Sequence, residues 1–127
     1  MDFSGSLYVA SASFGRGVFS KVAIPEGSKI ESAHIIVIPA VDRDILDTIA
    51  LHDYYFEWGE DYSDGAIALG YGSLYNHSYS PNAQYYRNLT NSTIDFFAVR
   101  HIDADEEITV NYNGASEDSG PLWFTSK

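Results

Sequence analysis

Hydrophobic residues in this chain come in short runs that are separated by polar turns. Apolar or alternating runs lie at residues 7–10, 18–23, 29–39, 93–100 and 107–112. Runs of this length, bounded by Gly, Pro, Ser and Asp, are typical of β-strands, and 29–39 has the length of two consecutive strand pieces. Residues 103–106 supply a polar turn between the last two runs. The acidic side chains of Asp103, Asp105, Glu106 and Glu107 are expected to be solvated at this turn. The pattern predicts one mostly-β domain of several short strands, without internal repeats or linkers.

Only two segments have the spacing of a helix. Apolar side chains recur at Ile45, Leu46, Ile49 and Ala50. This spacing predicts a helix within residues 42–56, with Asp42 or Asp44 available as the N-cap. Residues 72–75 are expected to form a single helical turn. The predicted domain therefore contains one or two short helices.

The composition excludes several classes of function. The chain has 127 residues, no cysteine and a formal net charge of -11. The length fits one domain. Without cysteine there is no disulfide framework, no thiolate metal site and no cysteine nucleophile. The charge argues against direct binding of nucleic acid, because neutralising phosphates needs clustered Lys and Arg, and it favours a basic partner.

Nothing in the sequence predicts a membrane segment or a metal site. The first residues carry neither a basic segment nor a long apolar run. The longest apolar run, residues 35–38, is far shorter than the roughly 20 residues that span a bilayer. We therefore expect a soluble intracellular protein, cytoplasmic or, in a eukaryotic host, nuclear. His34, His52 and His101 are scattered without the spacing of metal ligands.

The negative charge is concentrated in one stretch. Residues 44–64 contain seven acidic side chains and no Lys or Arg. One interpretation is a solvated helix face and loop. The other is a docking surface for a cationic peptide, which requires a chemically active site beside it.

Three short motifs carry candidate chemistry: Gly-Arg-Gly at 15–17, Asn-His-Ser-Tyr-Ser-Pro-Asn at 76–82, and Glu-Ile-Thr-Val-Asn-Tyr at 107–112. Two glycines at this spacing let the backbone approach a ligand closely, although a plain turn would also account for them. Adjacent Asn and His side chains offer an amide and an imidazole to a ligand. The third motif alone is a strand that ends in a tyrosine.

In this order and at these separations, the motifs resemble those of the SET-domain lysine methyltransferases. They correspond to that family's Gly-x-Gly loop, its Asn-His-Ser-x-x-Pro-Asn segment and its Glu-Leu-x-x-Asp-Tyr segment, and the likeness runs from about residue 8 to residue 112. The chain is similar in size to the compact viral SET proteins. The resemblance implies a β-clip-like fold of several short sheets with a pseudoknot. Its single domain would have a core at about 7–113, a variable insert at about 40–66 and a C-terminal lid segment at 114–127.

The resemblance also implies S-adenosylmethionine as cofactor and a protein lysine as substrate. The positions that would bind the cofactor are Gly15, Arg16, Gly17, Asn76 and His77. Tyr112 would stand at the methyl-transfer point, where the lysine channel ends. Trp123, within the C-terminal residues 121–124, would cover the adenine; packing of this segment against the sheet is the alternative.

The walls of the lysine channel are less completely specified. The family's Tyr-x-Gly is absent, and residues 32–34 read Ser-Ala-His. Tyr54, or its neighbour Tyr55, could supply the missing wall from the insert. Tyr85 would favour monomethylation, whereas the small Val110 would add room, so the number of methyl groups stays open.

The expected partner is a basic protein, such as a histone-like or ribosomal tail, and a homodimer is possible. The alternative function is a non-catalytic SET-fold module that binds protein. The missing Tyr-x-Gly motivates this alternative, as does Asn111 in place of the family's Asp.

Overall fold

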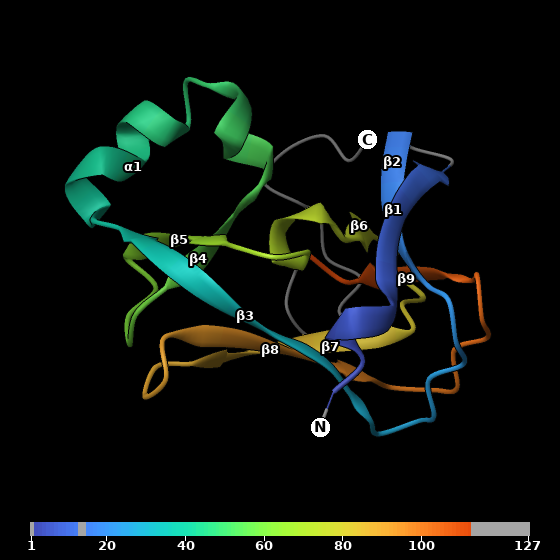
Figure 1. Cartoon of the computed structure of the whole chain (residues 1–127). Coiled ribbons are helices and arrows are strands. Elements are labelled where there is room, and N and C mark those ends of the chain that lie inside the picture. Colours follow the sequence, from blue (N-terminus) through green and yellow to red (C-terminus); the bar gives the residue numbers. More distant parts are fainter. Residues whose placement is uncertain (1, 13–14, 113–127) are drawn as a thin grey trace.

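The computed structural model describes residues 2–12 and 15–112, which form two β-sheets (Figure 1). In spatial order, the first sheet contains β1 (Leu7–Ala12), β2 (Gly15–Ser20), β9 (Glu107–Val110) and β6 (Asn76–His77). The second sheet contains β4 (Tyr55–Trp58), β5 (Asp64–Ala68), β3 (Lys29–Ile38), β8 (Thr93–Ala98) and β7 (Ala83–Asn88). The strands predicted at five places along the sequence are confirmed, and β4, β5, β6 and β7 are additional.

The long strand β3 connects the two halves of the second sheet. Residues 29–34 pair with β8, and residues 35–38 pair with β5. A bulge between Lys29 and Glu31 interrupts the first pairing. The two strand pieces expected at 29–39 are therefore one strand with two different neighbours.

The helix predicted within residues 42–56 is confirmed only as far as Leu46, and the rest of the prediction is wrong. Helix α1 (Ala40–Leu46) is followed by the short 3-10 helix η2 (Ala50–Asp53), and the chain then enters β4. Ile49 is extended, and the aromatic residues of β4 pair with β5 instead of continuing a helix. Neither Asp42 nor Asp44 caps α1, because the backbone N–H of Ala40 donates to the carboxylate of Asp64 at 2.9 Å.

After η1 (Ser4–Ser6) and η2, the third short 3-10 helix is η3 (Gly72–Leu74). It confirms the turn expected at 72–75 and leads into β6. Gly72 lies directly on the second sheet, where a Cβ atom would approach the Cβ of Ala33 to 2.9 Å. The chain then crosses to the first sheet, where β6 runs parallel to β9. Residues 72–77 therefore connect the two sheets.

The core lies between these elements and is built from short, fully buried aliphatic and aromatic side chains. Those without exposed surface are Val18, Ile24, Ile30, Ala66, Ala83, Ile94, Phe96, Ile102 and Ile108. In Figure 1, α1 and the β1–β2 hairpin lie at opposite sides of the molecule. No helix in the described part of the chain is long and apolar enough to cross a membrane.

Candidate active site

Tyr112 lies two residues after the end of β9 and is held at both its backbone and its side chain. Its backbone N–H donates to Nδ1 of His77 at 3.0 Å, and its hydroxyl donates to the carbonyl oxygen of Tyr75 at 2.7 Å. Burial raises the pKa of the Tyr112 hydroxyl well above its usual range, and the neighbouring Tyr54 and Asp53 add to this effect. The hydroxyl therefore stays protonated at neutral pH and cannot serve as a strong base.

Tyr112 belongs to a narrow aromatic pocket between the insert and the segment before β6. The residues that line it are Asp53, Tyr54, Tyr55, Phe56, Gly72, Ser73, Tyr75, Tyr85 and Tyr112. Its cavity volume is about 20 Å³, close to the space that one water molecule needs. Its aromatic walls suit a methylene stem and a terminal cation or amine.

The pocket brings together three of the four side chains predicted for the lysine channel. Tyr54, Tyr85 and Tyr112 line it, and so does Tyr55. The fourth, Val110, is not part of this lining: it is 1% exposed, lies in the core and pairs with His77 across β6 and β9.

Asp53, Phe56 and Tyr75 also line the pocket, although they were not singled out in the sequence. Phe56 and Tyr75 lie in no motif of their own. Their place is set by pairing and packing with residues distant in sequence, such as the edge-to-face contact of Phe56 with Tyr85 at 4.9 Å between ring centroids.

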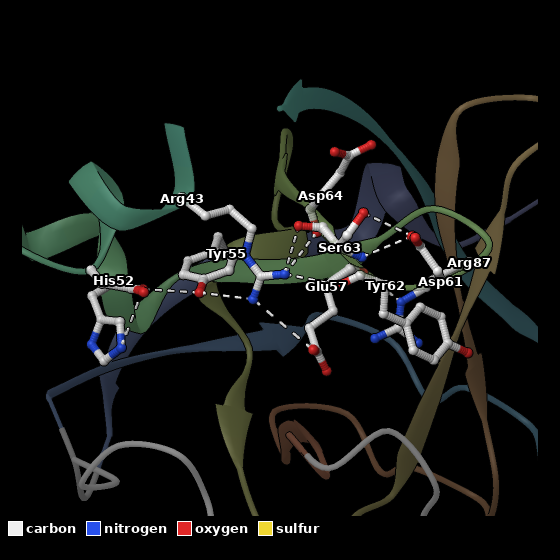
Figure 2. A network of polar contacts seen from close by, with 10 residues as sticks. Arg43, His52, Tyr55, Glu57, Asp61, Tyr62, Ser63, Asp64 and Arg87 are labelled. Carbon is white, nitrogen blue, oxygen red and sulfur yellow. Dashed lines mark hydrogen bonds and ion pairs between the residues drawn. The ribbon is translucent and has the colours of Figure 1, made fainter. Parts of the chain in front are cut away.

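A polar network fixes Tyr55 in the wall of this pocket (Figure 2). Nη2 of Arg43 donates to the Tyr55 hydroxyl at 3.2 Å, and that hydroxyl donates to the carboxylate of Asp47 at 2.9 Å. Nη1 of Arg43 donates to the carbonyl oxygens of Tyr62 and Ser63 at 2.8 and 2.9 Å. The guanidinium of Arg43, which lies in α1, thus connects the turn before β5 to the hydroxyl of Tyr55 in the pocket wall.

On the first sheet, the three sequence motifs meet at the side chain of Asn76. Its amide donates to the carbonyl oxygen of Arg16 at 2.9 Å and to the carboxylate of Glu107 at 2.7 Å. A Cβ atom on Gly17 would collide with the same carboxylate. Gly15 has a φ of +98°, which strongly favours glycine. Glu107, expected to lie in a solvated turn, instead connects two of the motifs.

Asn82 fixes the other end of the Asn-His-Ser segment. Its side-chain amide donates to the carbonyl oxygen of Glu107 at 2.8 Å, and its oxygen accepts from the backbone N–H of Thr109 at 2.9 Å. The side chain is 1% exposed. Residues 76–82 are therefore fastened along β9 at both ends.

The predicted cofactor-binding residues fit a polar ligand. Nδ1 of His77 accepts from Tyr112, so the neutral ring carries its proton on Nε2. Nε2 is buried and has no hydrogen-bond partner among the described residues, which leaves it for a ligand. Burial lowers the pKa of His77 and favours this neutral form. A Cβ on Gly15 would meet no atom within 4 Å, so the backbone there is open to close approach.

Two further expectations concern the lid and metal binding. Trp123 and the lid segment 114–127 lie outside the described residues. Within residues 2–12 and 15–112, no group of three or more His, Asp or Glu side chains is placed to hold a metal ion.

Comparison with known proteins agrees with this geometry. Residues 15–113 match the model of the SET domain family. A Schizosaccharomyces pombe protein, the histone-lysine N-methyltransferase specific for H3 lysine-37, is 29% identical over 111 residues, which are 87% of this chain and 70% of the relative.

Solved structures show the same fold. A Plasmodium falciparum protein classed as a histone methyltransferase superposes with a TM-score of 0.67 at 30% identity, covering 86% of this chain and 98% of its own. The second structure is a humanised mutant of Polycomb Repressive Complex 2 from Chaetomium thermophilum, bound to the inhibitor GSK126. It superposes with a TM-score of 0.70 at 18% identity, covering 84% of this chain and 14% of its own. The mostly-β SET fold is thereby confirmed, and the chain belongs to the SET-domain family.

Proposed function

We propose that this chain uses S-adenosylmethionine to methylate the side-chain amine of lysine in a basic protein. Its membership of the SET-domain family and its likeness to a histone-lysine N-methyltransferase support lysine methylation as the activity. The observation that carries the proposal is the protonated hydroxyl of Tyr112 in a narrow aromatic pocket, joined through His77 to the motif expected to hold the cofactor.

The pocket suits a lysine that must react as a neutral amine. At pH 7, removing the proton from an ordinary lysine of pKa about 10.4 costs roughly 4.6 kcal/mol. Burial among Tyr54, Tyr85 and Phe56 disfavours the charged form and so lowers this cost. S-adenosylmethionine supplies the methyl group and a sulfonium charge that also opposes a charged lysine, and it leaves as S-adenosylhomocysteine.

Tyr112 orients the amine in this proposal. Its hydroxyl donates to the carbonyl of Tyr75, and its oxygen is of the kind that can accept an N–H of the amine. Such a contact aligns the nitrogen lone pair for attack, which is a contribution of position rather than of base catalysis.

The cofactor would be held by the glycine motif and by the pair Asn76 and His77. The backbone at Gly15 is open to close approach, and the buried Nε2 of His77 offers a hydrogen-bond donor. Asn76 keeps the two parts together through Arg16. Coverage of the adenine by Trp123 remains a prediction.

A basic substrate follows from charge. The chain carries a formal net charge of -11, and Asp53, from the acidic stretch 44–64, lines the pocket itself. Negative side chains around a lysine channel attract a tail rich in Lys and Arg. A histone-like or ribosomal tail fits this requirement, and a histone substrate would place the chain in a nucleus.

Two measurements test the proposal. Calorimetry with S-adenosylmethionine separates an enzyme from a non-catalytic binding module, which has no need of the cofactor. A methyl-transfer assay on mixed core histones and other basic proteins then compares wild type with Tyr112→Phe. We expect turnover of the variant to fall by about 100-fold while cofactor affinity stays within about twofold.

Tyr86→Phe is the matched control, because Tyr86 is 51% exposed and does not line the pocket. It should behave as wild type does. A wild-type chain that binds no S-adenosylmethionine would contradict the proposal.

A further inference from the structure

We propose that Glu31 and Tyr75 are positioning residues that together hold the carbonyl group to which the Tyr112 hydroxyl donates. The inference rests on the proposed function and deepens it. Neither residue belongs to the three motifs. Glu31 lies in β3 and Tyr75 directly precedes β6.

Tyr75 connects the interior of the second sheet to the pocket through its two ends. Its hydroxyl donates to Oε1 of Glu31 at 2.6 Å. Its backbone carbonyl accepts from the Tyr112 hydroxyl at 2.7 Å. The hydrogen bond to Glu31 therefore helps to fix the position of the Tyr75 carbonyl. That carbonyl in turn sets the direction of the Tyr112 hydroxyl.

The pair is fully enclosed. Glu31 is 4% exposed and Tyr75 is 2% exposed. The Tyr75 ring packs on Phe96 with 4.6 Å between ring centroids, which leaves it little freedom to tilt. Because Glu31 belongs to the central strand of the second sheet, its carboxylate is a rigid reference point for the segment that enters β6.

The Glu31 carboxylate also contacts the turn before η3. The carboxylate accepts a backbone hydrogen bond from Tyr71, and Oε2 lies where a Cβ of Gly70 would come within 3.0 Å. Gly70 has a φ of +60°. Glu31 thus holds the turn at 70–71 as well as Tyr75, so that both ends of η3 are fastened to the same carboxylate.

Stability alone does not account for a carboxyl group in this place. Removing an ionised carboxylate from water costs several kcal/mol, and well-packed apolar side chains often stabilise a core as well or better. Burial raises the pKa of both Glu31 and Tyr75, which reflects this cost. A directional bond instead selects one position of Tyr75, which packing would fix less sharply.

Loss of the hydrogen bond between Glu31 and Tyr75 should lower turnover but leave the binding of cofactor and substrate unchanged. Asn76 and His77, which follow Tyr75, have their own anchors in Arg16, Glu107 and the backbone of Tyr112. Loss of the Glu31 contact would let the Tyr75 carbonyl move and misalign the Tyr112 hydroxyl. A misplacement of about 1 Å can cost about 100-fold in rate.

The decisive variant is the pair Glu31→Met with Tyr75→Phe. It removes the hydrogen bond without leaving a buried carboxylate unpaired, so the protein should remain folded. We expect kcat to fall at least about tenfold, while the KM for a basic peptide and the cofactor Kd change little. The thermal midpoint should fall modestly, because the backbone N–H of Tyr71 also loses its acceptor. Glu31→Gln, which keeps one acceptor for the Tyr75 hydroxyl, should retain more turnover than Glu31→Met.

Tyr71→Phe is the matched control. It also removes a tyrosine hydroxyl bond, from Tyr71 to the carbonyl of Leu7 at 3.1 Å, but that bond leads away from Tyr112. This variant should keep the kcat of wild type. A similar loss of kcat in Tyr71→Phe and in the paired variant would overturn the proposal.

A second readout does not depend on activity. In protein labelled with ¹³C at the tyrosine ζ-carbon, the Tyr112 resonance should shift in the paired variant and stay in place in Tyr71→Phe. An unmoved resonance, or an unchanged kcat in the paired variant, would overturn the positioning role while the proposed function stands. A wild-type chain without methyl transfer would instead refute the proposed function, and the resonance would still decide whether the pair positions Tyr112.

Discussion

The backbone N–H of Tyr112 donates to Nδ1 of His77 at 3.0 Å, so that the tyrosine of the pocket and the imidazole of the second motif are fixed to one another. The bond exists only while Nδ1 carries no proton. It makes the site sensitive to the protonation of His77 in a way that the exposed histidines cannot reproduce.

Acidification should therefore lower the stability of the wild-type chain more than it lowers the stability of the His77→Gln variant. Burial lowers the pKa of His77 in the folded state from its ordinary value of 6.5. As the pH falls, the unfolded chain therefore binds this proton before the folded chain does. Stability is lost from about pH 6.5, the ordinary pKa of histidine, down to the lower pKa that His77 has in the folded state. Urea unfolding at several pH values between about 8 and 5 measures this loss.

His34→Gln serves as the control, since His34 is exposed on β3. It should show the pH dependence of wild type. If His77→Gln and His34→Gln follow the same curve, the buried imidazole has no special part in the pH response.

Gly17→Ala should weaken the binding of S-adenosylmethionine by about tenfold, because the added Cβ displaces the Glu107 carboxylate that holds Asn76. Calorimetry measures the affinity. Gly5→Ala is the control, since a Cβ there meets no atom within 4 Å. Equal affinities of the two variants would show that Glu107 moves aside without cost.

Arg43→Met should lower the free energy of unfolding by about 1.5–3 kcal/mol, because Arg43 makes charged hydrogen bonds to two backbone carbonyls and to Tyr55. Arg100→Met removes an exposed contact with Glu106 and should cost at most about 1 kcal/mol. Urea unfolding of both variants gives the comparison. The reverse order would show that the network of Figure 2 does not stabilise the insert.

Salt should weaken the binding of a basic peptide to the acidic insert. Raising the salt from about 0.05 to 0.5 M should increase the KM by roughly tenfold and leave kcat nearly unchanged, because exposed charges are screened. Glu57→Gln, at the partly exposed Glu57 of the insert, should reduce this salt dependence. Asp103→Asn, at an exposed turn before β9, should not. A KM independent of salt would remove the docking interpretation of residues 44–64.

The motifs revealed the family because their residues lie next to one another in sequence, and five strands followed from their apolar runs. The helix boundary did not follow, because the group that binds the first backbone N–H of α1 is Asp64, 24 residues after Ala40. Strand β5 is likewise set by its pairing with β3, since its Gly and Ala residues carry little strand preference of their own.

The least visible parts of the site are its long-range contacts. The sequence predicts that Glu107 lies in a solvated acidic turn, yet its carboxylate accepts a hydrogen bond from Asn76, 31 residues away. Glu31 and Tyr75 are separated by 44 residues and show no pattern that would join them. Such contacts depend on the register of strands in two sheets, which a single sequence does not specify.

The divided pairing of β3 has a consequence for how such a chain can diversify. One half of the strand belongs to the sheet with β8, and the other half carries β5 and, through it, β4 and the acidic insert. New inserts could therefore be grafted onto the far half without altering the register beneath Glu31. Exchange of the insert would then change the pocket walls that Tyr54 and Tyr55 supply, and with them substrate preference, while Glu31 and the strands beneath it stay in place.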